Sequence, residues 1–164
     1  MADQNRSQTA VIIGQGYVGL PLAQAAAAAG VKVYGFDITQ SLVDQLNTGV
    51  SHIDDLSDSD VQTMLAQGYE ATTGASVIRM ADVVVVCVPT PLSEEGGPDL
   101  RAVEASARTI AENLSRDTVV VLESTTYPGT TDGVMLPLLE GSGLSHGEDF
   151  LLAYSPERVD PGSQ

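Results

Sequence analysis

The chain alternates short apolar runs with segments whose apolar residues recur at helical spacing, and turns rich in glycine, proline or acidic residues separate them. The apolar runs predict strands at residues 10–13, 31–36, 70–72, 82–88, 118–122 and 150–154. The segments between them predict helices at residues 20–29, 41–47, 61–67, 100–113 and 130–140, with a helical turn at 75–80. This order predicts an α/β fold in which helices cover both faces of a parallel sheet.

The first apolar run leads directly into a turn of the pattern G-x-G-x-x-G. Each glycine meets a separate physical need, since Gly14 allows a tight turn, Gly16 lets the backbone approach a pyrophosphate, and Gly19 lets the next helix pack closely on the strand. The N–H groups at the helix start, which includes Tyr17 and Val18, would bind phosphates with the help of the helix dipole. We therefore predict that this turn binds a dinucleotide.

The second apolar run ends in Asp37, 18 residues after Gly19. Its carboxylate would accept hydrogen bonds from the adenosine ribose and would repel the 2′-phosphate of NADP. Arginine and lysine are absent from the sequence between Phe36 and Gly74, so nothing there offsets that repulsion, and we predict NAD as the cofactor. Together these features predict a Rossmann-type, doubly wound parallel sheet with three layers, α/β/α.

Two alternatives share part of this pattern. A methyltransferase also has a glycine loop after its first strand and an acid after its second, and other α/β domains contain glycine-rich turns. The third glycine and the following Leu-Pro-Leu-Ala helix favour a dinucleotide.

Length and composition predict one globular domain, because 164 residues with 43% hydrophobic residues suffice for a full core. We assign residues 1–9 to a flexible polar tail and residues 10–164 to the NAD-binding domain. The sequence has no run of 18 apolar residues and no apolar segment near its start, so we expect no membrane span and no signal peptide. A single cysteine cannot form an internal disulfide, which fits a cytoplasmic location.

The net charge is −15, from 22 acidic and 7 basic residues. Such a surface repels nucleic acid and anionic membranes, so we expect neither as a partner. The same charge disfavours a polyanionic cofactor, and phosphate binding must therefore depend on local backbone N–H groups. Adaptation to salt and a genomic bias would each produce this composition.

Some reactive side chains are better explained by structure than by chemistry. The acidic stretch 50–60, which includes His52, is typical of a solvated loop and has no fixed metal-ligand spacing, so we predict no metal site. Cys87 is expected to be a small buried core residue, because no base or cation lies near it in sequence to activate a nucleophile. We expect His146 to be exposed, Asp99 to cap the helix at 100–113, and Thr130 or Thr131 to cap the helix that follows.

Polar or glycine-rich segments follow four of the predicted strands. In an open parallel sheet, ligands bind at the carboxyl ends of the strands, so these segments would line one crevice. We expect the first to hold the pyrophosphate, the next two to lie toward the nicotinamide, and the last to meet the substrate. The segments are residues 14–19, 88–91, 123–129 and 155–162.

Four motifs also carry a family resemblance. They are GQGYVGLP from Gly14, VCVPTP from Val86, ESTTYPGTT from Glu123 and YSPER from Tyr154. With them the chain resembles the N-terminal NAD-binding domain of the UDP-glucose/GDP-mannose 6-dehydrogenase family. Its UDP-sugar 6-dehydrogenases oxidise the C6 hydroxymethyl group of a nucleotide sugar to a carboxylate with two NAD. The motifs lie between residues 10 and 162, so the resemblance covers nearly the whole chain.

The resemblance implies roles for individual residues. Thr125 matches a threonine at the reacting centre, Glu157 matches a catalytic glutamate on the substrate side, and Arg158 would also contact the substrate. Thr90, Glu123 and Thr125 match positions near the nicotinamide and its ribose. Val88 and Pro89, in the segment that leads to Thr90, are expected to bind the cofactor as well.

The last motif also indicates a branch of the family. The form Arg-Val-Asp-Pro-Gly after Glu157 is similar to enzymes acting on UDP-N-acetylhexosamines, UDP-GlcNAc or UDP-ManNAc. A second glutamate of the UDP-glucose branch falls on Pro161, so its role does not carry over. The basic residue that often follows the acid of the second strand is missing from residues 38–42.

The family's catalytic cysteine, lysine and aspartate, its UDP-binding domain and its dimer-forming helix match no part of this chain. Cys87 cannot replace that cysteine, because it lies in the nucleotide-binding sheet by position. We therefore expect the NAD-binding part of a homodimeric enzyme, inactive alone. The alternatives are a stand-alone NAD-binding or redox-sensing module, the first domain of a UDP-glucose 6-dehydrogenase, and a hydroxy-acid or 6-phosphogluconate dehydrogenase.

Overall fold

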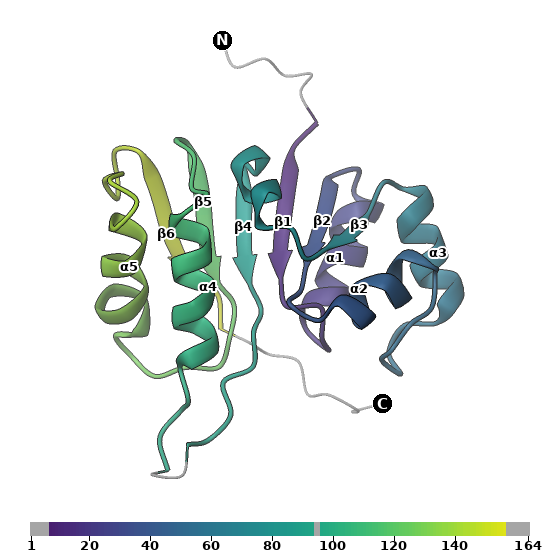
Figure 1. Ribbon diagram of the computed structural model, residues 1–164, viewed down its shortest axis with the longest axis horizontal. Helices are drawn as coiled ribbons and strands as arrows, with labels where there is room; N and C mark the ends of the chain where they lie inside the picture. Colours follow the sequence, from purple (N-terminus) through teal and green to yellow (C-terminus); the bar gives the residue numbers. More distant parts are fainter. Residues whose placement is uncertain (1–6, 94–95, 157–164) are drawn as a thin grey trace.

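The computed structural model describes residues 7–93 and 96–156, and its centre is a parallel sheet of six strands (Figure 1). The strands are β1 Thr9–Ile13, β2 Lys32–Phe36, β3 Glu70–Thr72, β4 Val83–Val86, β5 Thr118–Leu122 and β6 Phe150–Tyr154. Every neighbouring pair is parallel, and the order across the sheet is β3-β2-β1-β4-β5-β6. The order reverses between β1 and β4, which confirms the predicted doubly wound sheet.

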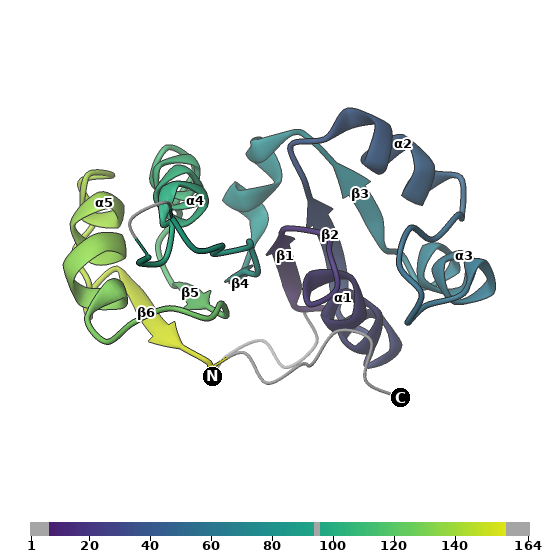
Figure 2. The ribbon, with the colours of Figure 1, turned by 90° about the horizontal axis from the view of Figure 1, so that it is seen from below.

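Helices lie on both faces of the sheet. They are α1 Gly19–Ala28, α2 Gln40–Asn47, α3 Asp58–Ala66, α4 Arg101–Ala111 and α5 Leu136–Glu140, with a 3-10 helix η1 Ala75–Met80 and a π-helix η2 Thr131–Met135. Figure 2 shows α4 and α5 over β4, β5 and β6 on one face, and α1 under β1 and β2 on the other. The three predicted layers are therefore present.

The core has two parts, one on each side of the sheet. Alternate residues of β4 face opposite sides: Val84 and Val86 pack with α4 and α5, whereas Val85 packs toward the cluster that contains α1. On the α1 side, the described residues leave Val121 partly exposed and Leu151 53% exposed. Each sheet face thus has its own helix cover, and the cover on the α1 side is less complete over β5 and β6.

Several element ends differ from the prediction. The first strand begins at Thr9, inside the predicted tail, and residues 1–6 lie outside the described part of the chain. The fourth strand ends at Val86 rather than at Val88, because Pro89 follows closely and has no N–H for a sheet ladder.

The predicted caps were partly wrong. The N-cap of α4 is Leu100 and not Asp99, although the Asp99 carboxylate accepts the N–H of Arg101 at 3.0 Å and pairs with its guanidinium group. Thr130 is the N-cap residue of η2, but its hydroxyl donates to the carbonyl oxygen of Tyr127 at 2.9 Å instead of accepting from the helix.

None of the helices in the described part of the chain is both long and apolar enough to span a bilayer.

Candidate functional site: a dinucleotide crevice at the carboxyl ends of the strands

A glycine turn joins β1 to α1 where the strand order reverses. Because β2 and β4 flank β1, the connections leave in opposite directions and open a crevice at the carboxyl ends of the strands. Gly14 has φ of 89°, and a Cβ there would lie 2.7 Å from the carbonyl oxygen of Cys87. A Cβ at Gly19 would lie 1.7 Å from the carbonyl oxygen of Gly14. The turn and the close helix packing therefore both require glycine, as predicted.

Gly16 has a different environment, because a Cβ at this position would meet nothing within 4 Å. The space beside it is open to a ligand. The N-cap of α1 is Val18, which has no side-chain hydrogen bond to the first turn, and Tyr17 beside it is 40% exposed. The N–H groups of this helix start are thus available to an anion, and the helix dipole favours negative charge there.

Asp37 follows β2 and is held by two backbone groups. Its Oδ2 accepts the N–H of Gln15 at 3.0 Å, and its Oδ1 accepts the N–H of Thr39 at 3.0 Å. A carboxylate has about four acceptor positions, so ribose hydroxyls can still donate to it. The carboxylate therefore has a set orientation toward the glycine turn.

Two cavities meet at this carboxylate. The larger, about 430 Å³, lies along the glycine turn, the start of α2 and the loops after β4 and β5. The smaller, about 340 Å³, is mainly apolar and lies between the strand ends and α4, with Ile13, Phe36 and Pro89 among its lining residues. Asp37 and Gly14 line both. An adenosine ribose joins an apolar base to a diphosphate, so a ribose at Asp37 would fit this arrangement.

The apolar cavity includes residues that the sequence analysis did not identify. One wall is a stripe of small side chains on α4, spaced i, i+3, i+4 and i+7, and the exposed Ile38 forms another part. That spacing was readable from the sequence as one helix face. The members of the stripe are Ala102, Ala105, Ser106 and Thr109.

The loops after β4 and β5 form the other end of the larger cavity. All five residues predicted near the nicotinamide line it: Val88, Pro89, Thr90, Glu123 and Thr125. The Thr90 hydroxyl donates to the carbonyl oxygen of Thr125, and the Ser124 hydroxyl donates to that of Val88 at 2.9 Å. These bonds tie the two loops together, so the five residues lie in one wall.

Comparison of the sequence with protein families gives a match over residues 8–164. The matching family is described as the UDP-glucose/GDP-mannose dehydrogenase family, NAD binding domain. The chain belongs to this family. It is an NAD-binding domain, and NAD is its cofactor, which agrees with the open space at Gly16 and the carboxylate between the two cavities.

Similar proteins are much longer than this chain. It is 39% identical to the UDP-N-acetyl-D-mannosamine dehydrogenase of Pyrococcus horikoshii, over 92% of the chain and 36% of that protein. It is 38% identical to the UDP-N-acetyl-D-glucosamine 6-dehydrogenase of Pseudomonas aeruginosa, over 93% of the chain and 36% of that protein. The solved structure of UDP-D-ManNAc dehydrogenase from Pyrococcus horikoshii matches with a TM-score of 0.88, 94% of the chain and 37% of that structure. The chain thus spans about a third of their length.

In this family domain Cys87 is a packing residue. It is 7% exposed and belongs to the core cluster that includes α1, where its Cβ would lie 3.4 Å from a Cβ at Gly19. The prediction of a buried cysteine is confirmed, and close helix packing explains why a small side chain stands there.

The acidic stretch 50–60 of the family domain begins a helix. Ser57 and Asp60 form a capping box at the start of α3, and Asp58 accepts the N–H of Ser51 at 2.8 Å. The carboxylates of Asp58 and Asp60 thus accept hydrogen bonds from backbone N–H groups.

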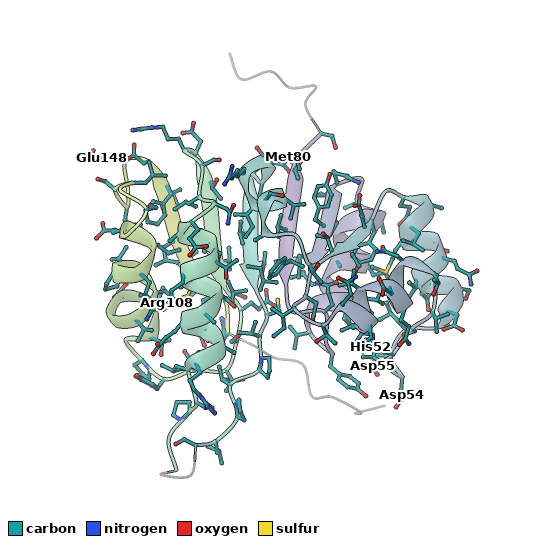
Figure 3. All side chains as sticks on the ribbon, in the orientation of Figure 1. His52, Asp54, Asp55, Met80, Arg108 and Glu148 are labelled. Atoms are coloured by element: carbon teal, nitrogen blue, oxygen red, sulfur yellow. The ribbon has the colours of Figure 1, made fainter. Side chains whose placement is uncertain are left out.

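His52 lies in the same stretch but nearer to the dinucleotide site. Figure 3 shows it with Asp54 and Asp55 at the carboxyl end of the strands, opposite Met80 and Glu148. Burial lowers the pKa of His52, although the backbone of Gln15 and the negative charge of Asp37 act in the opposite direction.

Two predicted substrate residues of the family, Glu157 and Arg158, lie outside the described residues. The chain just before them is tied to the sheet, because the Ser155 N–H donates to the carbonyl oxygen of Leu122 at 2.9 Å. The last motif thus begins beside the loop that holds Thr125.

Proposed function

We propose that this NAD-binding domain serves a UDP-N-acetylhexosamine 6-dehydrogenase, which oxidises the C6 hydroxymethyl of its sugar to a carboxylate. Bound NAD would accept the hydride in each of the two oxidations. The observation that carries the proposal is the continuous wall from the glycine turn to Thr125, next to the start of the Ser-Pro-Glu-Arg motif. Relatives named for UDP-N-acetyl-D-mannosamine and UDP-N-acetyl-D-glucosamine support the sugar class.

In this proposal the chain's own residues have four roles. The helix start at Tyr17 and Val18 binds the diphosphate, and Asp37 binds the adenosine ribose. Thr125, whose side chain is exposed at the end of the cavity, orients the hydroxyl or water at the reacting carbon. Glu157 and Arg158 bind the substrate side, with Glu157 as a catalytic group.

A first experiment measures binding and turnover on the 164-residue chain. We expect calorimetry to detect NAD and only weak NADP binding, and we expect no NADH from UDP-GlcNAc or UDP-ManNAc. NAD-dependent oxidation of either sugar by this chain would contradict the prediction that the nucleophile lies elsewhere.

A second experiment tests the sugar on the full-length protein. UDP-GlcNAc, UDP-ManNAc and UDP-glucose are supplied separately, and NADH is counted per sugar consumed. We expect two NADH per N-acetylhexosamine; preferential oxidation of UDP-glucose would place the enzyme in the other branch.

Location and assembly belong to the same proposal. We place the enzyme in the cytoplasm, which its use of NAD supports and which fits the lone cysteine of the 164-residue chain. We expect the full enzyme to be a homodimer. Sedimentation of the full-length protein tests this expectation.

A further inference from the structure

The residue after the first glycine of the turn, Gln15, points its side chain into the protein. It is fully buried, at 0% exposure. Its Nε2 donates to the carbonyl oxygens of Ile12 at 2.8 Å and of Gly14 at 3.3 Å. Its Oε1 accepts the hydroxyl of Tyr69 at 2.7 Å. This side chain therefore holds the turn to β1 and to Tyr69 from the interior side of the turn.

Tyr69 reaches this position from 54 residues away in sequence. It lies just before β3 and is 3% exposed. Burial, with the negative charge of Asp37, raises the pKa of Tyr69 far above its usual value. The phenol thus stays protonated, and its hydroxyl is a permanent donor to Gln15.

The sheet makes room for this pair at Gly35, in the middle of β2. A Cβ there would lie 2.4 Å from both Gln15 Oε1 and the Tyr69 hydroxyl oxygen. Glycine in a strand interior is unfavourable and often marks a close approach of other groups. The missing side chain at this position is therefore part of the same arrangement.

The backbone of Gln15 is held as well, because its N–H donates to the Asp37 carboxylate at 3.0 Å. Side chain and backbone of one turn residue are thus fixed by separate groups on β1, just after β2 and just before β3. Tyr69 is absent from the lining of both cavities, among the residues described, so its effect on a ligand must pass through the turn.

We propose that Tyr69 and Gln15 are positioning residues that hold the phosphate-binding turn in its ligand-ready shape. The inference rests on the dinucleotide site of the proposed function and adds to it a dependence on a hydroxyl outside the cavity. Since the turn presents its N–H groups to the diphosphate, removing the support should weaken diphosphate binding and leave adenosine binding unchanged.

The test compares Tyr69→Phe with a matched control on the 164-residue chain. The control is Thr118→Val, which removes a buried hydroxyl whose 3.2 Å bond to the carbonyl oxygen of Ala81 lies between the amino ends of β4 and β5. For Tyr69→Phe we expect the Kd of ADP-ribose to rise roughly 5- to 10-fold. The Kd of adenosine should change less than about 2-fold. For Thr118→Val both constants should stay near the parent values.

A double variant separates positioning from stability. Gln15→Met with Tyr69→Phe removes both partners of the Tyr69–Gln15 hydrogen bond, but the carbonyl oxygens of Ile12 and Gly14 also lose their Nε2 donor, so we expect a lower melting temperature. Binding is therefore measured well below the melting temperature of the variant, where the chain is folded, and we expect ADP-ribose still to bind weakly. The positioning role is overturned if the double variant binds ADP-ribose as tightly as the parent does. It is also overturned if Thr118→Val raises the Kd of ADP-ribose as much as Tyr69→Phe does. If the parent itself binds no ADP-ribose, the assignment of the dinucleotide site is wrong, and the positioning role that rests on it is wrong as well.

Discussion

At the scale of single residues, the site depends on polar groups whose orientation is set before any ligand binds. Asp37 shows this most clearly, because both carboxylate oxygens already accept backbone N–H groups, from Gln15 and Thr39. A ribose would therefore meet an ordered acceptor rather than a freely rotating one. Less conformational entropy is then lost on binding.

Replacing this carboxylate should weaken cofactor binding and reduce the selectivity of the site for NAD over NADP. For Asp37→Ala we expect NAD binding to weaken by about 1–3 kcal/mol, the range for hydrogen bonds to a charged group. The difference between NAD and NADP should shrink, because the charge that repels the 2′-phosphate is gone. Calorimetry with both nucleotides measures this. Glu148→Ala, at the opposite end of the molecule in Figure 3, controls for net charge. Unchanged NAD affinity in Asp37→Ala would refute the ribose assignment.

The glycines of the turn should respond differently to substitution. Gly16→Val meets no protein atom near its Cβ, so the fold should persist while the side chain fills the ligand space and NAD binding is lost. Gly19→Val places its Cβ against the Gly14 carbonyl oxygen and should unfold the chain. Thermal melting and NAD titration of both variants give the comparison. A Gly16→Val protein that still binds NAD would show that the diphosphate lies elsewhere.

Residue-level prediction from sequence worked where a motif has a known geometry. The tight turn at Gly14, where φ is 89°, followed from the glycine pattern, and the burial of Cys87 followed from its position near the end of a strand. The Tyr69–Gln15 hydrogen bond did not, because periodicity carries no information about which side chains meet across 54 residues.

At the scale of elements, apolar runs predicted strands well. β3, β5 and β6 have the predicted bounds, since turn residues flank short runs that suit strands. Helix starts were less accurate. α3 begins at Asp58 rather than at residue 61, because Ser57 and Asp60 form a capping box that polar composition alone concealed. The predicted helix at 130–140 begins with the π-helix η2, an irregularity that a 3.6-residue period cannot show.

The connection between α2 and α3 should give the chain a measurable pH dependence. The pKa of His52 is lower in the folded chain, so unfolded chains bind its proton more strongly. Its stabilising contribution is therefore complete above the unfolded pKa of about 6.5 and is lost as pH falls toward the folded value.

We expect the melting temperature of the parent to fall more between about pH 7.5 and about pH 5.5 than that of His52→Gln. His146→Gln, in an exposed loop, serves as the control and should follow the parent. Identical acid sensitivity of parent and His52→Gln would mean that this histidine is not coupled to folding.

At the scale of the whole molecule, the charge of −15 works against an anionic ligand. Local N–H groups at the start of α1 attract phosphate, whereas the distant carboxylates repel it over lengths that salt screens. Added salt should therefore reduce the repulsion between the distant carboxylates and the phosphate more than the attraction between the N–H groups of α1 and the phosphate. We expect ADP-ribose to bind roughly 2- to 5-fold more tightly when KCl is raised from about 20 to about 200 mM.

This dependence has the opposite sign to that of a basic phosphate-binding surface, and calorimetry at the two salt concentrations measures it. Weaker binding at higher salt would indicate that the local field at the turn dominates the field of the surface.

The glycine in the middle of β2 has a consequence for how this domain tolerates change. As long as glutamine and tyrosine occupy positions 15 and 69, no residue with a Cβ fits at position 35. An alanine at 35 becomes acceptable only when shorter side chains stand at both of the other two positions, because its Cβ would meet each of them at 2.4 Å. Residues 15, 35 and 69, although far apart in the sequence, can therefore change only in compatible combinations. A library that randomises them together should recover folded combinations that libraries of single changes never reach.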